Sequence, residues 1–220
     1  EFRRVLFRSI FKIDGGLAVF DRIDLTTDGT VTALTGSADL AHFPEMTYQI
    51  DSTIDFAPMR RIFFAKDHFD LSGTGHFVGS WHLYKNGRDL AGVFSAPTLG
   101  IDDYRFSDVR GELLWTPDRF DVTSGRAGVY GGTGRFTYGM GPFGKKTQPA
   151  VATFDTAYEG VDLARVSEFY RTRGLRLAGR ATGHNILSWP LGRFRDHEGG
   201  GTVTATPPDG TRLATRELGP

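Results

Sequence analysis

Apolar and polar residues alternate from position 71 to position 84, and this is the most regular pattern in the chain. Side chains of a β-strand point alternately to opposite faces, so a period of two predicts a strand with one apolar and one mixed face. The alternation resumes after Asn86-Gly87, a pair suited to a two-residue type I′ turn, and we therefore predict a hairpin. Its apolar face carries Phe77, Trp81, Leu83, Leu90 and Phe94.

Turn residues separate further alternating segments along the chain. Asp28-Gly29 stands between one pair of such segments, and Pro117-Asp118 stands between another. These residues are typical of tight turns, because glycine reaches positive φ readily and proline presets its own φ. The pattern predicts a chain of antiparallel hairpins and places the protein in the all-β class.

Two segments have a helical period instead. In residues 162–173, Asp162 can cap the start of a helix and Gly174 can end it. Residues 55–63 form a similar apolar stripe, with Pro58 in the first turn, where a proline is tolerated. We predict two short amphipathic helices, each followed by a strand. The apolar face of the later helix consists of Leu163, Val166, Phe169 and Tyr170.

Both helical segments belong to a longer internal repeat. Ile54-Asp55-Phe56-Ala57 matches Val161-Asp162-Leu163-Ala164, and the pattern Gly-His-x-x-x-Ser-Trp-x-Leu occurs at positions 75–83 and again at positions 183–191. An ordered series of matches at a nearly constant offset predicts duplication of a structural unit. We predict two tandem β modules, residues 10–105 and residues 106–220, that share one continuous sheet.

Residues 1–9 stand apart from this pattern. They read Glu-Phe-Arg-Arg-Val-Leu-Phe-Arg-Ser, which resembles one reading frame of a common sequencing-adapter oligonucleotide. We expect them to be non-native and exclude them from fold reasoning. On this interpretation the native sequence begins near Ile10 in a truncated gene, and an upstream signal peptide or membrane anchor is missing.

Composition narrows the possible partners. The 26 basic and 26 acidic residues cancel, so binding to nucleic acid or to an anionic membrane would need a local patch. Arginines gather between residues 171 and 195, but acidic residues interrupt them, and we predict no nucleic-acid partner. The chain has no cysteine, which excludes disulfides and thiolate metal sites.

The spacing and surroundings of the histidines and glycines argue against a metal site and a phosphate-binding loop. His76 and His82 point to one face of a strand, but six residues at about 3.3 Å each place them roughly 20 Å apart. His197-Glu198 precedes three glycines in what we interpret as a loop. Gly131-Gly132-Thr133-Gly134 lacks the Lys-Ser/Thr and the helix of a phosphate loop. We predict no metal and no cofactor.

Acid–base catalysis by a pair of aspartates is the last catalytic possibility that the sequence offers. Asp102, Asp103, Asp118 and Asp121 lie around predicted turns, where aspartate commonly bonds to the local backbone. A hydrolase would need two of them in one pocket. The sequence contains neither a Gly-x-Ser-x-Gly elbow nor a His-Glu-x-x-His motif. We predict that the protein is not an enzyme.

Several of these motifs together resemble the AsmA-like and TamB-like envelope proteins of diderm bacteria. The motifs are a Val-Asp-Leu helix start, a Leu-x-Gly-x-Ala/Gly-x-Gly segment and Tyr130-Gly131-Gly132, and the likeness covers most of residues 19–205. The resemblance implies an extended, curved antiparallel sheet, groove-like or taco-like, that crosses the periplasm from an inner-membrane anchor upstream. It also implies phospholipid transport between the inner and outer membranes, or outer-membrane biogenesis.

The apolar face of the predicted hairpin can then be interpreted in two ways. In the first, its five side chains line a groove for phospholipid acyl chains, and inner-membrane and outer-membrane components bind through regions that are missing. In the second, the same face is the core of a β-sandwich adhesin or carbohydrate-binding module. Trp115, Tyr130 and Tyr138 would then be stacking platforms, and two sheets packed face to face would favour this alternative.

Overall fold

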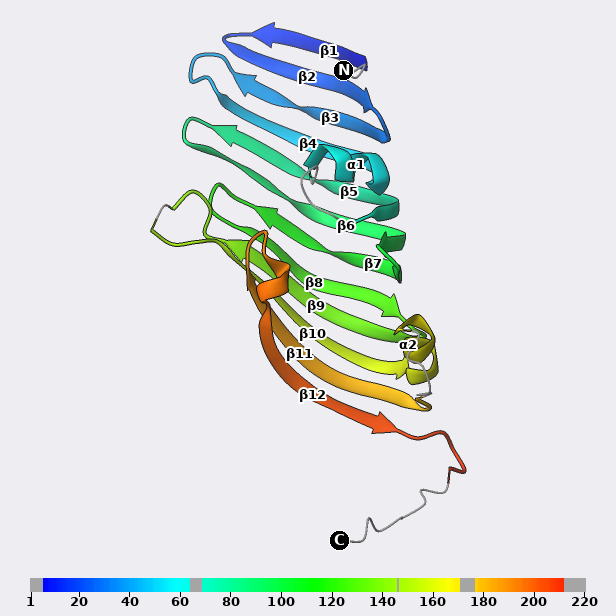
Figure 1. Cartoon of the computed structure of the whole chain (residues 1–220). Coiled ribbons are helices and arrows are strands. Elements are labelled where there is room, and N and C mark those ends of the chain that lie inside the picture. The colour runs from blue at the N-terminus through cyan, green and yellow to red at the C-terminus, as the bar shows by residue number, and fades with distance from the viewer. Residues whose placement is uncertain (1–5, 64–68, 146, 171–176, 212–220) are drawn as a thin grey trace.

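A computed structural model describes residues 6–63, 69–145, 147–170 and 177–211. Twelve strands form one antiparallel sheet in which each strand pairs with its neighbours in sequence (Figure 1). The elements are β1 (Leu6–Asp14), β2 (Leu17–Thr27), β3 (Thr30–Asp39), β4 (Glu45–Asp55), α1 (Phe56–Phe63), β5 (Leu71–Tyr84), β6 (Gly87–Ile101), β7 (Tyr104–Trp115), β8 (Phe120–Val129), β9 (Gly132–Gly141), β10 (Val151–Asp162), α2 (Leu163–Tyr170), β11 (Arg180–Pro190), the 3₁₀ turn η1 (Phe194–Asp196) and β12 (Glu198–Thr206).

The predicted all-β class, with an extended antiparallel sheet and two short helices, is confirmed. The sheet is open and forms a single layer. The chain exposes 15718 Å² of surface, whereas a compact monomer of this mass exposes about 10,000 Å². Within the described ranges no large side chain is fully buried. Much of the apolar surface therefore lacks a second layer above it.

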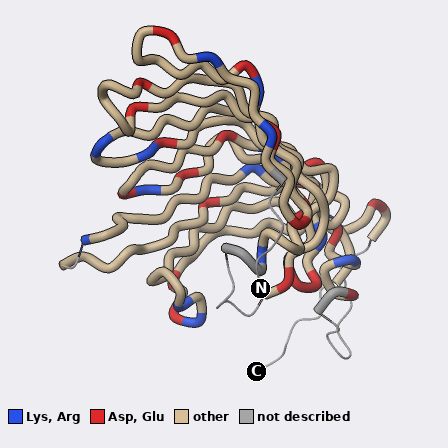
Figure 2. Tube along the Cα trace, turned by 90° about the horizontal axis from the view of Figure 1, so that it is seen from above, with Lys and Arg blue, Asp and Glu red and all other residues tan. Residues whose placement is uncertain are grey.

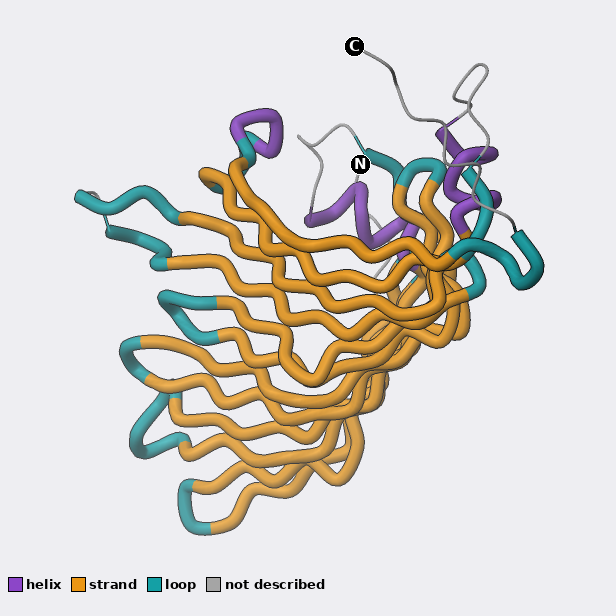
Figure 3. Tube along the Cα trace, turned by 90° about the horizontal axis from the view of Figure 1, so that it is seen from below, coloured by secondary structure: helices purple, strands orange, loops and turns teal. Residues whose placement is uncertain are grey.

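The strands bend along their length, so that the sheet is a trough with a concave and a convex face (Figures 2 and 3). Register shifts interrupt the pairing in β2, β5, β7, β8 and β10. Such bulges bend a strand and increase its twist. Helix α1 lies over the concave face of the sheet, where its residue Phe56 packs against Gly75 of β5.

Both helices begin with a capping aspartate directly after a strand. The backbone N–H of Ala57 donates to Asp55 at 3.1 Å, and that of Ala164 donates to Asp162 at 2.9 Å. Helix α2 ends at Tyr170, and the predicted continuation to residue 173 with its Gly174 cap lies outside the described residues. No helix in the described ranges is long and apolar enough to cross a membrane.

Contacts around the two helix-to-strand junctions recur six strands apart. Gly73 and Gly179 have φ values of 107° and 106°, and a Cβ at either would collide with the carbonyl oxygen of a threonine on the next strand. His76 and His184 each bond to an aspartate of the preceding strand, at 2.8 and 2.7 Å. These contacts accord with the predicted repeat. The sheet runs unbroken past residue 105, which lies at the start of β7, and the module boundaries stay a prediction.

The predicted type I′ turn between β5 and β6 is wrong. The turn residues are Lys85 and Asn86, and neither Asn86 nor Gly87 has the positive φ that type I′ requires. Glycine at position 87 is required for a steric reason and not for its backbone conformation. A Cβ there would stand 2.5 Å from Cγ of Pro117 in the neighbouring hairpin. The other two predicted turns join β2 to β3 and β7 to β8 as expected.

The predicted loop around residues 197–201 is also wrong, since β12 begins at Glu198. Gly199 pairs with Leu187 and Gly201 pairs with Asn185. A Cβ at either glycine would collide with a backbone carbonyl of β11. Glycine here permits close approach of two strands and does not mark a loop.

Candidate functional site

An apolar groove of about 460 Å³ lies on the concave face, and β2 to β7 together with α1 contribute its walls. This volume is typical of ligand clefts, which range over about 300–1,000 Å³. None of the described residues that line it is an Asp, Glu, Lys or Arg. Its apolar lining consists of Leu25, Leu34, Ile50, Ile54, Phe56, Met59, Phe77, Trp81, Leu90, Phe94 and Leu113.

Four of the five side chains named from the sequence line this groove, namely Phe77, Trp81, Leu90 and Phe94. Register explains their proximity, because Phe77 pairs with Phe94 and Trp81 pairs with Leu90 across β5 and β6. Leu83 does not line the groove. It lies nearer the β5–β6 turn, where it pairs with Arg88.

The sequence patterns did not single out the groove residues of β2, β3, β4 and β7. Leu25, Leu34, Ile50 and Leu113 each lie on a strand of their own, and strand pairing places them beside β5 and β6. The helical stripe of residues 55–63 did signal Phe56 and Met59 as apolar. Only the packing of α1 onto β5 shows that they face the same groove.

Aromatic rings lie close against glycines of the groove floor. The ring of Phe77 covers Gly79 and Gly92, that of Phe94 covers Gly111, and that of Phe56 covers Gly75. A Cβ at Gly79 or Gly92 would stand 2.7 Å from Cζ of Phe77. Glycine at these positions leaves the space that each ring occupies, because a Cβ there would collide with the ring.

The polar residues of the groove lining are Thr32, Ser52, His76 and Ser95. The hydroxyls of Thr32 and Ser52 lie 2.7 Å apart on the paired strands β3 and β4, and Ser52 is 5% exposed. Each hydroxyl satisfies the other, which avoids the cost of a buried polar group without a partner. Neither of these two hydroxyls is left without a hydrogen-bond partner in the groove floor.

A row of aromatic side chains crosses most of the sheet on the concave face. Neighbouring ring centroids lie 5.1 to 6.4 Å apart within each half of the row. Leu90 joins the halves, because it pairs with Trp81 on one side and with Trp115 on the other. The row continues the groove floor in both directions. Its members are Phe11, Phe20, Tyr48, Trp81, Trp115, Phe120, Tyr138, Trp189 and Phe194.

The two tyrosines of this aromatic row direct their hydroxyls to methionine sulfur. Tyr48 donates to Sδ of Met46 at 3.4 Å, and Tyr138 donates to Sδ of Met140 at 3.6 Å. Burial raises the pKa of both phenols above the ordinary value of 10.0, because the charged form loses hydration. Both tyrosines are therefore neutral parts of an apolar surface.

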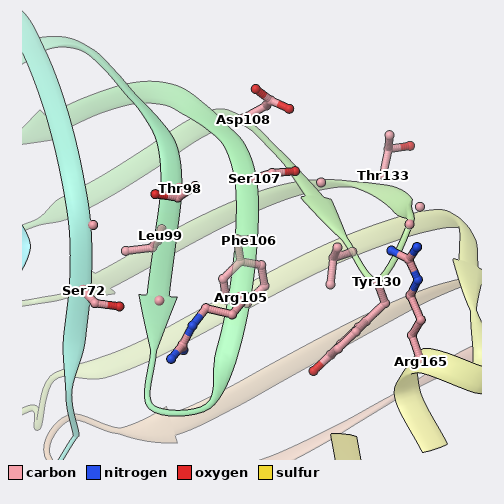
Figure 4. A pocket seen from close by; sticks show the side chains of 16 residues that line it. Ser72, Thr98, Leu99, Arg105, Phe106, Ser107, Asp108, Tyr130, Thr133 and Arg165 are labelled. Carbon is pink, nitrogen blue, oxygen red and sulfur yellow. The ribbon is translucent and has the colours of Figure 1, made fainter. Parts of the chain in front are cut away.

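A second cavity of about 650 Å³ has a different chemistry (Figure 4). Arg105 of β7 and Arg165 of α2 line it, together with Asp108, several hydroxyl side chains and glycine backbone. None of the side chains named as lipid-groove candidates lies in it. Its charged lining does not suit acyl chains, although it is the larger of the two cavities.

The histidines considered as metal ligands bond to separate carboxylates. His76 bonds to Asp51, and His82 bonds to Glu45. The described part of the chain contains no group of three or more His, Asp or Glu side chains that could hold a metal ion.

The aspartates considered as catalytic lie at opposite ends of β7. Asp102 and Asp103 belong to the β6–β7 turn, and the carboxylate of Asp102 accepts the N–H of Asp70 at 2.8 Å. Asp118 accepts from the hydroxyl of Thr116, and Asp121 is paired with Arg119 at 2.8 Å. Neither cavity described above is lined by any of the four.

The geometry required by the sandwich alternative does not occur within the described ranges, because the strands form one sheet and not two packed face to face. Of its proposed stacking platforms, Trp115 is covered by the guanidinium of Arg88 at 5.4 Å. Tyr138 packs between Phe120 and Trp189 within the aromatic row, and Tyr130 borders the polar cavity.

No family model matches the chain, and neither a curated protein nor a solved structure matches it.

Proposed function

We propose that the apolar groove shelters phospholipid acyl chains, and that the chain is a segment of an AsmA-like or TamB-like protein of the bacterial envelope. Such a segment would serve phospholipid transport between the inner and outer membranes, or outer-membrane biogenesis. It would lie in the periplasm and be anchored in the inner membrane through a region outside this sequence. The observation that carries the proposal is an open apolar groove on a single-layer sheet.

The chemistry of the groove supports acyl chains as the occupant. Apolar surface left in water costs about 25 cal/mol per Å², and contiguous apolar patches on soluble proteins commonly mark binding sites. An acyl chain would cover the rings of Trp81 and Phe94 without needing a hydrogen bond. None of the described lining residues is an Asp, Glu, Lys or Arg, and this disfavours strongly charged ligands.

The extent of the apolar surface supports a role as a segment of a longer path. Twelve strands at about 4.8 Å spacing give a sheet roughly 50 Å wide across the strands. The aromatic row runs in that same direction, from Phe11 on β1 to Phe194 after β11. A chain of lipids could therefore move across successive strands along one continuous face.

Photocrosslinking tests the proposal with adjacent residues on opposite faces. A benzophenone side chain at Phe94 points into the groove, whereas one at Val93, which is 54% exposed, points away from it. After irradiation with phosphatidylcholine, which is neutral, mass spectrometry should find phospholipid attached at position 94 and much less at position 93. Equal labelling at both positions, or none at 94, would count against the proposal.

A further inference from the structure

Three arginines stand side by side on neighbouring strands. Arg110 of β7 pairs with Arg126 of β8, and Arg126 pairs with Arg135 of β9. Directly opposed residues share a face of the sheet, and neighbouring strands lie about 4.8 Å apart. All three side chains are exposed. We call them the arginine row.

The arginine row lies on the convex face, opposite the groove. Gly111 and Gly125, which adjoin Arg110 and Arg126, face the rings of Phe94 and Phe136. Adjacent residues of a strand point to opposite faces. The arginines therefore point away from the rings and into solvent.

The described carboxylates form no ion pair with the arginine row. Within the described part of the chain, none of its three guanidinium groups forms an ion pair, whereas Arg22 and Arg119 each pair with an aspartate at 2.8 Å. On the same face Glu112 is two residues from Arg110, and its carboxylate accepts the hydroxyl of Thr123 at 3.4 Å.

The flanks of the arginine row carry one exposed acid, Glu159, which is two residues along β10 from Ala157, the residue that pairs with Arg135. One strand beyond each neighbour lie His76 and His184, and each is bonded to an aspartate, Asp51 and Asp155 respectively. Like charges directly opposed across strands destabilise a sheet. The row therefore costs stability, which favours a role in binding.

The curvature of the convex face favours a flat partner surface. The sheet bends along its strands (Figures 2 and 3), so its outer face resembles a cylinder whose axis crosses the strands. Register shifts on both sides of Arg110 and beside Gly125 bend β7 and β8 at this position. A flat surface touches a cylinder along a line parallel to its axis, and the arginine row follows such a line.

We propose that Arg110, Arg126 and Arg135 bind the phosphate headgroups of an anionic membrane surface. Guanidinium groups bond phosphate oxygens in pairs and suit this contact. Val78 and Val93 pair on the same face and are 42% and 54% exposed, which fits a lipid interface. A single-stranded nucleic acid would require aromatic stacking platforms, and the aromatic row is on the other face. The inference does not depend on the occupant of the groove.

Vesicle sedimentation tests the proposal with the full chain. The vesicles would contain phosphatidylcholine alone, or phosphatidylcholine with phosphatidylglycerol at about 3:1. The wild type should bind the anionic vesicles, less at high salt, and should not bind the neutral ones. Each single Arg→Gln change should weaken binding about fivefold, and the triple variant R110Q/R126Q/R135Q about a hundredfold.

A matched control distinguishes the effect of the arginine row from the effect of the net charge of the protein. The triple variant R22Q/R119Q/R193Q removes the same formal charge from arginines that pair with Asp24, Asp121 and Asp196, and it should retain vesicle binding. The arginine-row variant should also melt no lower than the wild type, because repulsion is relieved. Equal loss in the control, equal binding to both vesicle types, or binding of an oligonucleotide without binding of vesicles would overturn the proposal.

Discussion

The ring of Phe77 contacts Gly92 on the neighbouring strand, and both residues lie on the face of the sheet that carries the groove. A Cβ at Gly92 would stand 2.7 Å from the ring's Cζ. Phe77 is only 7% exposed, although no second sheet covers it within the described ranges. The glycine therefore lets the ring lie against the backbone of the adjacent strand, and this contact contributes to its burial.

Replacing Gly92 with alanine should destabilise the protein by about 1–3 kcal/mol, since the new methyl would press on Phe77 and on the backbone of β5. The free energy of unfolding in urea measures this loss. Gly200→Ala is the matched control, because a Cβ there meets nothing within 4 Å. It should leave stability nearly unchanged. Equal effects at the two positions would show that Phe77 does not depend on Gly92.

The hydroxyl pair in the groove floor predicts a non-additive double-mutant cycle. Ser52→Ala should cost about 1–3 kcal/mol, because it leaves the hydroxyl of Thr32 without its partner. Adding Thr32→Val should restore much of that loss, since neither polar group then remains. Urea unfolding of the wild type, both single variants and the double variant measures the coupling energy. Strictly additive losses would exclude the bond as a stabilising contact.

Alkaline pH should destabilise the aromatic row. Burial raises the pKa of Tyr48 and Tyr138 in the folded state, so the fold favours the protonated phenols. Their contribution is complete below pH 10.0, the ordinary pKa, and is lost as the pH rises through the folded values. Thermal melting from pH 8 to 11 should show a steeper decline for the wild type than for Tyr48→Phe/Tyr138→Phe. Parallel declines would contradict this assignment.

The two helix caps should contribute equally if the junctions are equivalent. Asp55→Ala and Asp162→Ala should each cost about 1 kcal/mol, because each removes the acceptor for an N–H in the first turn. The helices are six strands apart, so the double variant should show the sum. Asp103→Ala, an exposed turn position, serves as the control. A loss at only one cap would argue against equivalent junctions.

The sequence was sufficient wherever a structural element depends on neighbouring residues. Alternation in residues 71–94 predicted the β5–β6 hairpin and four of the eleven apolar groove residues, and Asp162 was predicted as the cap of the second helix. Phe77, Trp81, Leu90 and Phe94 share a face because one hairpin pairs them. Leu83 follows the same alternation, but its distance along the strand takes it beyond the groove.

Features that depend on register between separate hairpins could not be predicted in this way. Arg110 and Arg126 lie opposite each other only because bulges shift the pairing of β7 with β8, and the sequence does not locate those bulges. Gly87 was interpreted as a turn residue, yet its role is to accommodate Pro117 from the next hairpin. Such contacts arise from tertiary packing and leave no local pattern.

Fluorescence quenching of Trp81 by acyl chains tests the central claim most directly. Replacing the other two tryptophans, Trp115 and Trp189, with phenylalanine leaves Trp81 in the groove as the only reporter. A lysophospholipid with a brominated acyl chain, added below its micelle concentration, should quench Trp81 strongly and saturably, whereas the unbrominated lipid should not. If the brominated lipid fails to quench while aqueous acrylamide does, the groove is filled by water and the account is contradicted.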